Sequence, residues 1–373
     1  MTNHKQAKFL SLSLLAASVA LPAMAQWKKP TITPFDAPGA STVSSPACAP
    51  YCGTTAYANN DVGDIVGSYT DANIVPHGFL RHVDGKITSF DAPGAGLGYG
   101  LDQGTAAYSI NDLGVITGQF EDANNVYHGF VRDSYGFFTT FDAPDAGTGA
   151  YQGTLALSIN LEGATAGIYI DKNNVYHGFA RSRQGKIVSV DPPGSVYTYP
   201  CQETCINFEG SIAGFYADAT STFHGFVRDR DGGIKTFDAP GAGTGNYTGT
   251  IAASINPEGV IVGYLADSNS VARGFVRYPD GFFATFNDPV AATGSGQGTA
   301  AFSINPEGTI AGEYLDANNI SHGFQRAPDG TFTTIDAPKA PGGTRPTTNN
   351  WVGAVTGYFF DVNSVVHGFL WMP

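Results

Sequence analysis

Apolar and polar residues alternate along this chain in short runs, which are separated by clusters of glycine, proline, asparagine and aspartate. Residues 104–141 show the pattern: the runs "GTAAYSI", "VITGQFE", "YHGFVR" and "FFTTF" are interrupted by the turn sequences "NDLG", "DANN" and "DSYG". Alternation with a period of two is typical of β-strands, and connections this short join antiparallel neighbours. The segment therefore predicts a four-stranded antiparallel sheet.

This four-strand unit recurs along the chain. The glycine of a His-Gly-Phe or Arg-Gly-Phe phrase recurs every 45 to 51 residues, at positions 78, 129, 178, 225, 274, 323 and 368. A phrase resembling Phe-Asp-Ala-Pro begins at positions 35, 90, 141, 190, 237, 286 and 335. Repeats of this length with four strands predict propeller blades, whereas one coil of a parallel β-helix needs about half as many residues.

The two ends of the chain each carry part of one unit. "TITPFD" near the N-terminus has no His-Gly-Phe before it, and the last His-Gly-Phe has no Phe-Asp-Ala-Pro after it. Pairing these ends would complete the unit and close a ring. The predicted fold is therefore all-β: a seven-bladed β-propeller of four-stranded antiparallel blades, closed by an N-terminal strand that joins the C-terminal blade. Runs rich in small residues, such as "GTIAASI", are expected to be the innermost strands.

The phrases "INPEGTIAGEYLD" and "HGF" within residues 304–324 resemble the HAF-repeat family of bacterial extracellular repeat proteins. The resemblance covers roughly residues 31–373. It implies an exported repeat protein, and that family supplies no catalytic residues to carry over.

Residues 1–25 are typical of a secretory signal peptide: Lys5 and Lys8 precede an apolar run from Phe9 to Leu21, and Ala23-Met24-Ala25 suits cleavage near Ala25. We expect residues 26–373 to form one propeller domain, secreted to the periplasm or beyond without a membrane anchor. Removing two lysines and no acids lowers the net charge from −13 to −15. Such acidity disfavours nucleic acid and leaves a glycan or protein as the expected partner.

Four cysteines form two local pairs, Cys48/Cys52 and Cys201/Cys205. An oxidising compartment favours a disulfide within each pair, although a metal or redox role is the alternative.

A repeated acid–base pair accompanies the His-Gly-Phe phrase. An aspartate precedes each histidine by six residues, and Asp267 precedes Arg273 in the same way; the pairs are Asp71/His77, Asp122/His128, Asp171/His177, Asp218/His224, Asp316/His322 and Asp361/His367. Because an active site needs one special blade, we interpret these pairs as structural clasps across a hairpin. Catalysis by such a pair is the alternative.

No cofactor is expected. One histidine per blade cannot converge on a metal when neighbouring sheets lie about 10 Å apart. The "DANN" stretch resembles the start of a calcium loop but lacks its glycine and its bidentate glutamate, so we interpret it as a turn and keep calcium as an alternative.

The linkers between units are long and are expected on the same face as the "DANN" loops. Five tyrosines in or near these linkers are candidate ligand-binding residues, either exposed for stacking on a sugar or packed between blades: Tyr99, Tyr151, Tyr197, Tyr199 and Tyr247. The favoured function is non-catalytic binding of a glycan or protein through this face. A secreted polysaccharide lyase or glycosidase at the channel mouth, and a structural role in an envelope, are the alternatives. Irregular acids such as Asp102, Glu203 and Glu313 form no obvious catalytic pair, so no catalytic residue is assigned.

Overall fold

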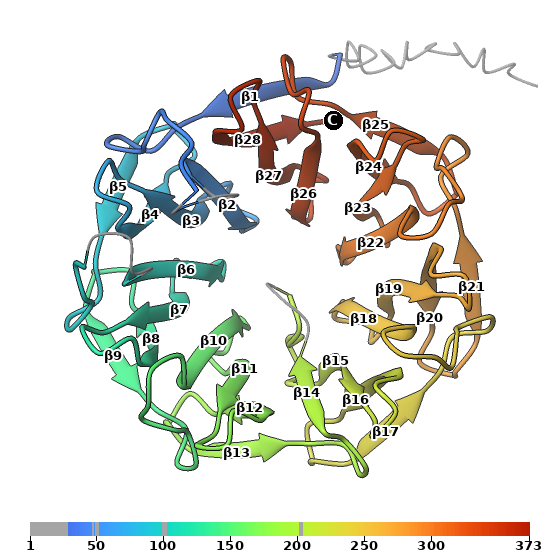
Figure 1. Cartoon of the computed structure of the whole chain (residues 1–373), viewed down its shortest axis with the longest axis horizontal. Helices are drawn as coiled ribbons and strands as arrows, with labels where there is room; N and C mark the ends of the chain where they lie inside the picture. Colours follow the sequence, from blue (N-terminus) through green and yellow to red (C-terminus); the bar gives the residue numbers. More distant parts are fainter. Residues whose placement is uncertain (1–28, 47, 49–51, 99–102, 201–203) are drawn as a thin grey trace, which may run out of the picture.

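A computed structural model describes residues 29–46, 48, 52–98, 103–200 and 204–373. Every regular element in these ranges is a β-strand, and no helix occurs in them. The strands follow one another in groups of four, and Figure 1 shows these groups arranged around a common centre. The predicted signal peptide lies outside the described residues.

Each group of four strands, called a unit below, runs from the centre to the rim (Figure 1). The innermost strands are β2 (Thr54–Asn59), β6 (Gly104–Ile110), β10 (Gly153–Ile159), β14 (Tyr197–Pro200), β18 (Gly249–Ile255), β22 (Gly298–Ile304) and β26 (Thr344–Asn349). The second strands are β3 (Ile65–Thr70), β7 (Ile116–Glu121), β11 (Thr165–Ile170), β15 (Ile212–Ala217), β19 (Ile261–Ala266), β23 (Ile310–Leu315) and β27 (Val355–Phe360). The third strands are β4 (Pro76–Arg81), β8 (Tyr127–Arg132), β12 (Tyr176–Arg181), β16 (Phe223–Arg228), β20 (Ala272–Arg277), β24 (Ser321–Arg326) and β28 (Val366–Met372). The outer strands are β5 (Ile87–Phe90), β9 (Phe138–Phe141), β13 (Ile187–Val190), β17 (Ile234–Phe237), β21 (Phe283–Phe286), β25 (Phe332–Ile335) and β1 (Thr31–Phe35).

The first strand of the chain pairs with the last one. β1 lies antiparallel to β28, with Thr31 opposite Met372 and Phe35 opposite Gly368 (Figure 1). The order of this sheet is β1-β28-β27-β26, so the N-terminal strand occupies the outer position that a fourth consecutive strand fills in the other units.

A fully buried phenylalanine ring from each third strand forms the core between units. These rings belong to the His-Gly-Phe or Arg-Gly-Phe phrases: Phe79, Phe130, Phe179, Phe226, Phe275, Phe324 and Phe369. Glycine is required before each of these phenylalanines, because another group of the protein lies too close to leave room for a side chain. A Cβ added at Gly129, for example, would lie 2.9 Å from the ring of Phe141 on the outer strand. The phrase is therefore a packing motif, in which glycine makes room for a phenylalanine ring in five units and for Val190 or Pro346 in the other two.

A chain of asparagine side chains links the units near their inner ends. Each buried asparagine donates from Nδ2 to the backbone carbonyl of the next one at 2.9–3.5 Å. The series runs through Asn60, Asn111, Asn160, Asn207, Asn256, Asn305 and Asn350, and Asn350 donates to the carbonyl of Asn60. The last unit is thus hydrogen-bonded to the first.

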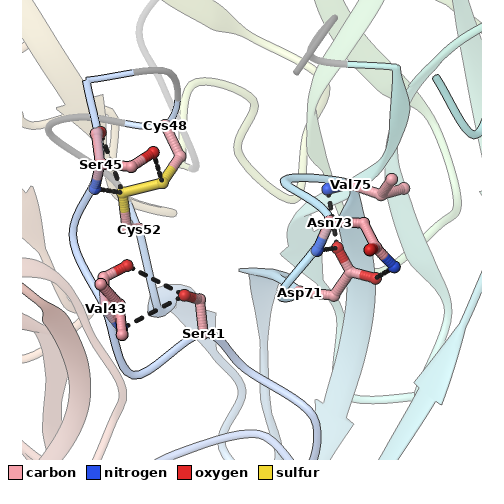
Figure 2. The surroundings of a disulfide bond; sticks show 8 residues. All are labelled: Ser41, Val43, Ser45, Cys48, Cys52, Asp71, Asn73 and Val75. Carbon is pink, nitrogen blue, oxygen red and sulfur yellow. Dashed lines mark hydrogen bonds between the residues drawn. A yellow bond between two sulfur atoms is a disulfide. The ribbon is translucent and has the colours of Figure 1, made fainter. Parts of the chain in front are cut away.

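The structure contains one of the two predicted disulfides. Cys48 and Cys52 are bonded, with 5.1 Å between their Cα atoms, in the loop that leads to β2 (Figure 2). Cys205 is instead a buried free cysteine, and its expected partner Cys201 lies outside the described residues. The structure therefore does not support the second predicted disulfide.

Candidate functional site

One pair of facing positions on the two inner strands changes chemistry from unit to unit. The paired residues are Thr55/Ser68, Ala106/Gln119, Leu155/Ile168, Tyr199/Phe215, Ile251/Tyr264, Ala300/Glu313 and Arg345/Tyr358. Their neighbours are far more uniform, because a glycine precedes the second-strand residue in every unit. Variation confined to one repeated position next to the centre marks a surface that packing alone does not dictate.

A cavity of about 520 Å³ lies at the inner strands of four consecutive units. It is lined by residues from the β14, β18, β22 and β26 units, which lie side by side in Figure 1. The variable pairs of these units contribute most of the lining. We call this cavity the axial pocket, and its volume is typical of a small-molecule site.

Aromatic rings form much of the wall of the axial pocket. On the β14 side, Tyr197 and Tyr199 are stacked, with centroids 6.1 Å apart and planes 12° from parallel. Tyr199 also stacks on Phe215, at 5.7 Å. The other units add Tyr264, Phe302 and Tyr358. Flat apolar faces that also carry hydroxyl groups suit a ligand with both apolar and hydroxyl surfaces.

A charged pair stands among these rings. Arg345 Nε lies 3.5 Å from a carboxylate oxygen of Glu313, and the same oxygen accepts a hydrogen bond from the hydroxyl of Ser321. Arg345 comes from the innermost strand β26 and Glu313 from β23, so the pair bridges two units. The pair supplies a guanidinium donor and a carboxylate acceptor at one end of the pocket.

Burial raises the pKa of two tyrosines in the pocket. For Tyr264, burial is the main cause, and the nearby carboxylate of Glu313 adds to it. For Tyr197, burial again comes first, followed by Tyr199 and Tyr176. A tyrosine phenol is protonated at neutral pH even with its ordinary pKa of 10, and the raised pKa of these two extends that state to higher pH.

The structure separates the five tyrosines predicted to bind a ligand. Tyr197 and Tyr199 lie on β14 and line the axial pocket. Tyr151 and Tyr247 are exposed tips of two different linkers, with positive φ angles of 63° and 58°. Tyr99 lies outside the described residues. The described tyrosines therefore do not form one binding surface.

The predicted Asp–His pairs are in contact, but the closer partner of each histidine was missed. Histidine Nε2 lies 3.5–3.8 Å from the predicted aspartate at His77, His128, His177, His224, His322 and His367. Nδ1 lies nearer, 2.8–3.0 Å, to the aspartate of the Phe-Asp-Ala-Pro-like phrase: Asp91, Asp142, Asp191, Asp238, Asp336 and Asp36 respectively. Each imidazole also faces an aromatic ring of the second strand at 4.8–5.2 Å.

In the "DANN" loops the aspartate carboxylate accepts hydrogen bonds from groups of the same loop. In the first loop, Asp71 Oδ1 accepts hydrogen bonds from the backbone N–H groups of Asn73 and Val75, and Asp71 Oδ2 accepts one from the Asn73 side chain (Figure 2). This is the geometry of a turn. No group of three or more His, Cys, Asp or Glu side chains in the described ranges is placed to hold a metal ion.

The long linkers and the "DANN" loops lie together, as expected. Gln152 of one linker donates to Lys172 O and Asn174 Oδ1 in the following loop. Tyr151 N–H donates to the carbonyl of Asn125 in the preceding loop. Linkers and loops therefore form one continuous face.

The pocket residues Phe215, Tyr264, Arg345 and Tyr358 were not singled out from the sequence. A signal was present: the residue that follows the glycine of each second strand is Ser, Gln, Ile, Phe, Tyr, Glu and Tyr in turn. Comparing this column across the repeats would have located the pocket.

Neither a family model nor a curated protein matches this chain. Solved structures do. A streptogramin B lyase is 15% identical with a TM-score of 0.57, covering 91% of this chain and 97% of its own. Virginiamycin B lyase from Staphylococcus aureus is 12% identical with a TM-score of 0.58, covering 92% and 100%. The BP39L lectin from Burkholderia pseudomallei is 8% identical with a TM-score of 0.54, covering 86% and 98%.

These similarities show the fold alone. The chain is a β-propeller protein built from four-stranded antiparallel sheets. Proteins of this architecture include a lectin and lyases. The fold is therefore compatible with ligand binding, but it does not by itself indicate one activity. In the part of the chain that the structure describes, no helix is long and apolar enough to cross a membrane.

Proposed function

We propose that this protein is a secreted, seven-bladed, closed propeller that binds a glycan in the axial pocket without catalysis. The closed ring is supported by the β1–β28 pairing and by the asparagine series that returns to Asn60. Export is supported by the signal-like residues 1–25, and membership of the HAF-repeat family by the repeated phrases. The single domain would span residues 26–373.

The observation that carries glycan binding is the aromatic wall around a charged pair. A pyranose ring has an apolar face that stacks on tyrosine or phenylalanine, and hydroxyl groups at its edge. Tyr199 and Phe215 offer the stacking surface, while Glu313 accepts and Arg345 donates hydrogen bonds. Such a pair can bind two neighbouring hydroxyl groups, each of which is both donor and acceptor.

The test is binding of the mature chain to a panel of neutral and acidic oligosaccharides, followed by calorimetric titration of those retained. Tyr199→Ala removes one stacked ring and should weaken binding about tenfold. Tyr247→Ala is the matched control, because that ring is 69% exposed on a linker away from the pocket. The proposal is wrong if no oligosaccharide binds, or if Tyr199→Ala binds as tightly as the parent.

A second candidate function is glycan cleavage in the same pocket. The observation in its favour is the placement of Glu313, a carboxylate held by Ser321 and Arg345 where a bound chain would pass. Release of reducing ends or unsaturated products from the panel, abolished by Glu313→Gln, would replace the binding function with this one. Binding without product release supports the non-catalytic function.

A further inference from the structure

The β18 unit (β18 to β21) differs from the other units in the cluster around the histidine. Elsewhere the cluster contains an aromatic ring on the second strand, the histidine of the third strand, and an aspartate after the outer strand. The β18 unit has Leu265, Arg273 and Asn287 in these places. Leu265 pairs with Arg273 in the same register that pairs Tyr314 with His322 in the next unit. Three interacting positions have therefore changed together.

A fourth position changes from a small apolar residue to an acid. Asp288 N–H donates to Thr299 Oγ1 at 2.9 Å. The alanine of the same phrase in the next unit, Ala337, makes the matching hydrogen bond to Thr344. Asp288 thus occupies a position that holds alanine or proline in every other unit, and its side chain is only 5% exposed.

A cavity of about 410 Å³ lies at this altered cluster. It is formed by the 267–273 segment of the β18 unit and by the 287–293 linker that leads to β22. Side chains that can form hydrogen bonds line much of it: Asp267, Asn269, Arg273, Asn287, Asp288 and Thr293. We call it the β21–β22 cavity. None of its residues lines the axial pocket, so the two cavities are separate.

Two charged groups in the β21–β22 cavity have unused hydrogen-bonding capacity. Arg273 makes one ion pair, from Nη2 to Asp267 at 3.3 Å, and half of its side chain is exposed. Asp288 Oδ1 accepts from Val290 N–H at 3.0 Å, and no other hydrogen bond to its carboxylate occurs within the described residues. Burial raises the pKa of Asp288, and the Val290 N–H and the nearby His322 of the next unit oppose this shift.

We propose that the β21–β22 cavity binds a neutral, polyhydroxylated ligand of about monosaccharide size. Vicinal hydroxyl groups can accept from the Arg273 guanidinium and donate to the Asp288 carboxylate, and the amide of Asn287 can do both. Two carboxylates beside one guanidinium disfavour an anion, and the guanidinium disfavours a bare metal cation. The volume lies at the lower end of the range typical of small-ligand sites.

The test uses the mature chain and four free sugars, D-glucose, D-galactose, D-mannose and D-xylose, titrated by saturation-transfer NMR. At least one should bind saturably. Asp288→Ala, which restores the alanine of the other units, should weaken this binding at least about tenfold while leaving the melting temperature near that of the parent. Arg273→His, which restores the usual histidine, should weaken it similarly.

The matched control is His128→Arg, which makes the same kind of exchange in the β6 unit, away from the β21–β22 cavity, and should leave sugar binding unchanged. Tyr199→Ala separates this site from the axial pocket, since it should impair oligosaccharide binding and leave monosaccharide binding intact. The inference is overturned if none of the four sugars binds, if Asp288→Ala binds like the parent, or if calcium alone binds in an Asp288-dependent manner.

Discussion

Each asparagine of the inner series uses both ends of its side chain. Asn160 accepts from the N–H of Ala164 at 2.9 Å, which closes the turn of its own unit. It donates to the carbonyl of Asn207 in the next unit at 3.0 Å. The residue is almost fully buried, so neither bond can be replaced easily by water. One residue type therefore fixes both a turn and a contact between units.

Replacing Asn160 with alanine should destabilise the protein by roughly 2–4 kcal/mol, because a buried N–H and a buried carbonyl lose their partners. Urea unfolding followed by circular dichroism measures the change. Asn124→Ala, in an exposed turn, is the control and should cost less than about 1 kcal/mol. Equal effects of the two substitutions would contradict a special role for the series.

Two histidines are expected to make stability depend on pH. The hydrogen bond that the His77 ring donates to Asp91 is the main cause that raises the pKa of His77 above its ordinary value of 6.5, and the hydrogen bond to Asp36 does the same for His367. Protonation therefore favours the folded state. This stabilisation is complete below about pH 6.5 and is lost as the pH rises through the folded-state pKa values.

The double variant His77→Gln/His367→Gln should consequently lose stability at pH 5.5 and change little at pH 8.5. Melting temperatures across this range, compared with the parent, measure the difference. If the melting temperatures of variant and parent differ by the same amount at every pH, protonation of these two histidines does not contribute to stability.

At the scale of elements, the sequence predicted the strands well, because each has a period-two pattern bounded by turn residues. The run "VITGQFE" is the strand β7 with one residue of its turn. The innermost strand β14 is the exception. It has only four residues, whereas β10 has seven. The sequence from Thr198 to Asn207 is three residues longer than the matching stretch from Thr154 to Asn160, so the pattern of the other units does not apply to it.

Strand β1 is expected to contribute strongly to stability, because it completes the sheet that the two ends of the chain share. Deleting residues 26–38 should expose an edge of β28 and the Gly368 face that the Phe35 ring covers. We expect the melting temperature to fall by more than about 10 °C. Deleting only residues 26–29 keeps β1 and is the control. A full deletion that melts like the control would refute the role of this strand.

For the whole molecule, repeat spacing predicted the architecture, and it could do so because every unit repeats the same packing residues. The proposed binding site followed the opposite rule. Glu313 was noticed as irregular, but Arg345 and Tyr358 belong to the next unit and meet it only once the units are packed side by side. Likewise, Asp288 is conspicuous only after alignment with the alanine or proline of the other units. The residues that repeat build the scaffold, whereas both proposed sites lie where residues depart from the repeat.

The sheet that the two ends of the chain share leads to a prediction about circular permutation. In both permutants a short linker joins the present ends. New ends within residues 133–136 place β9 at the start of the chain and β8 at its end, so that the two ends of the chain share the β6 unit as they now share the β26 unit. New ends within residues 94–98 leave every unit continuous. We expect the first permutant to melt near the parent and the second to be clearly less stable by calorimetry. Equal stability would show that sharing a unit is unimportant.

The pairing of β1 with β28 also has a consequence for biosynthesis. His367 and its partner Asp36 are 331 residues apart in the chain. During synthesis β1 has no pairing partner until β28 has been translated. The sheet that they share therefore assembles only after all the strands between them have been made, and until then its unpaired edges are open to association with other chains.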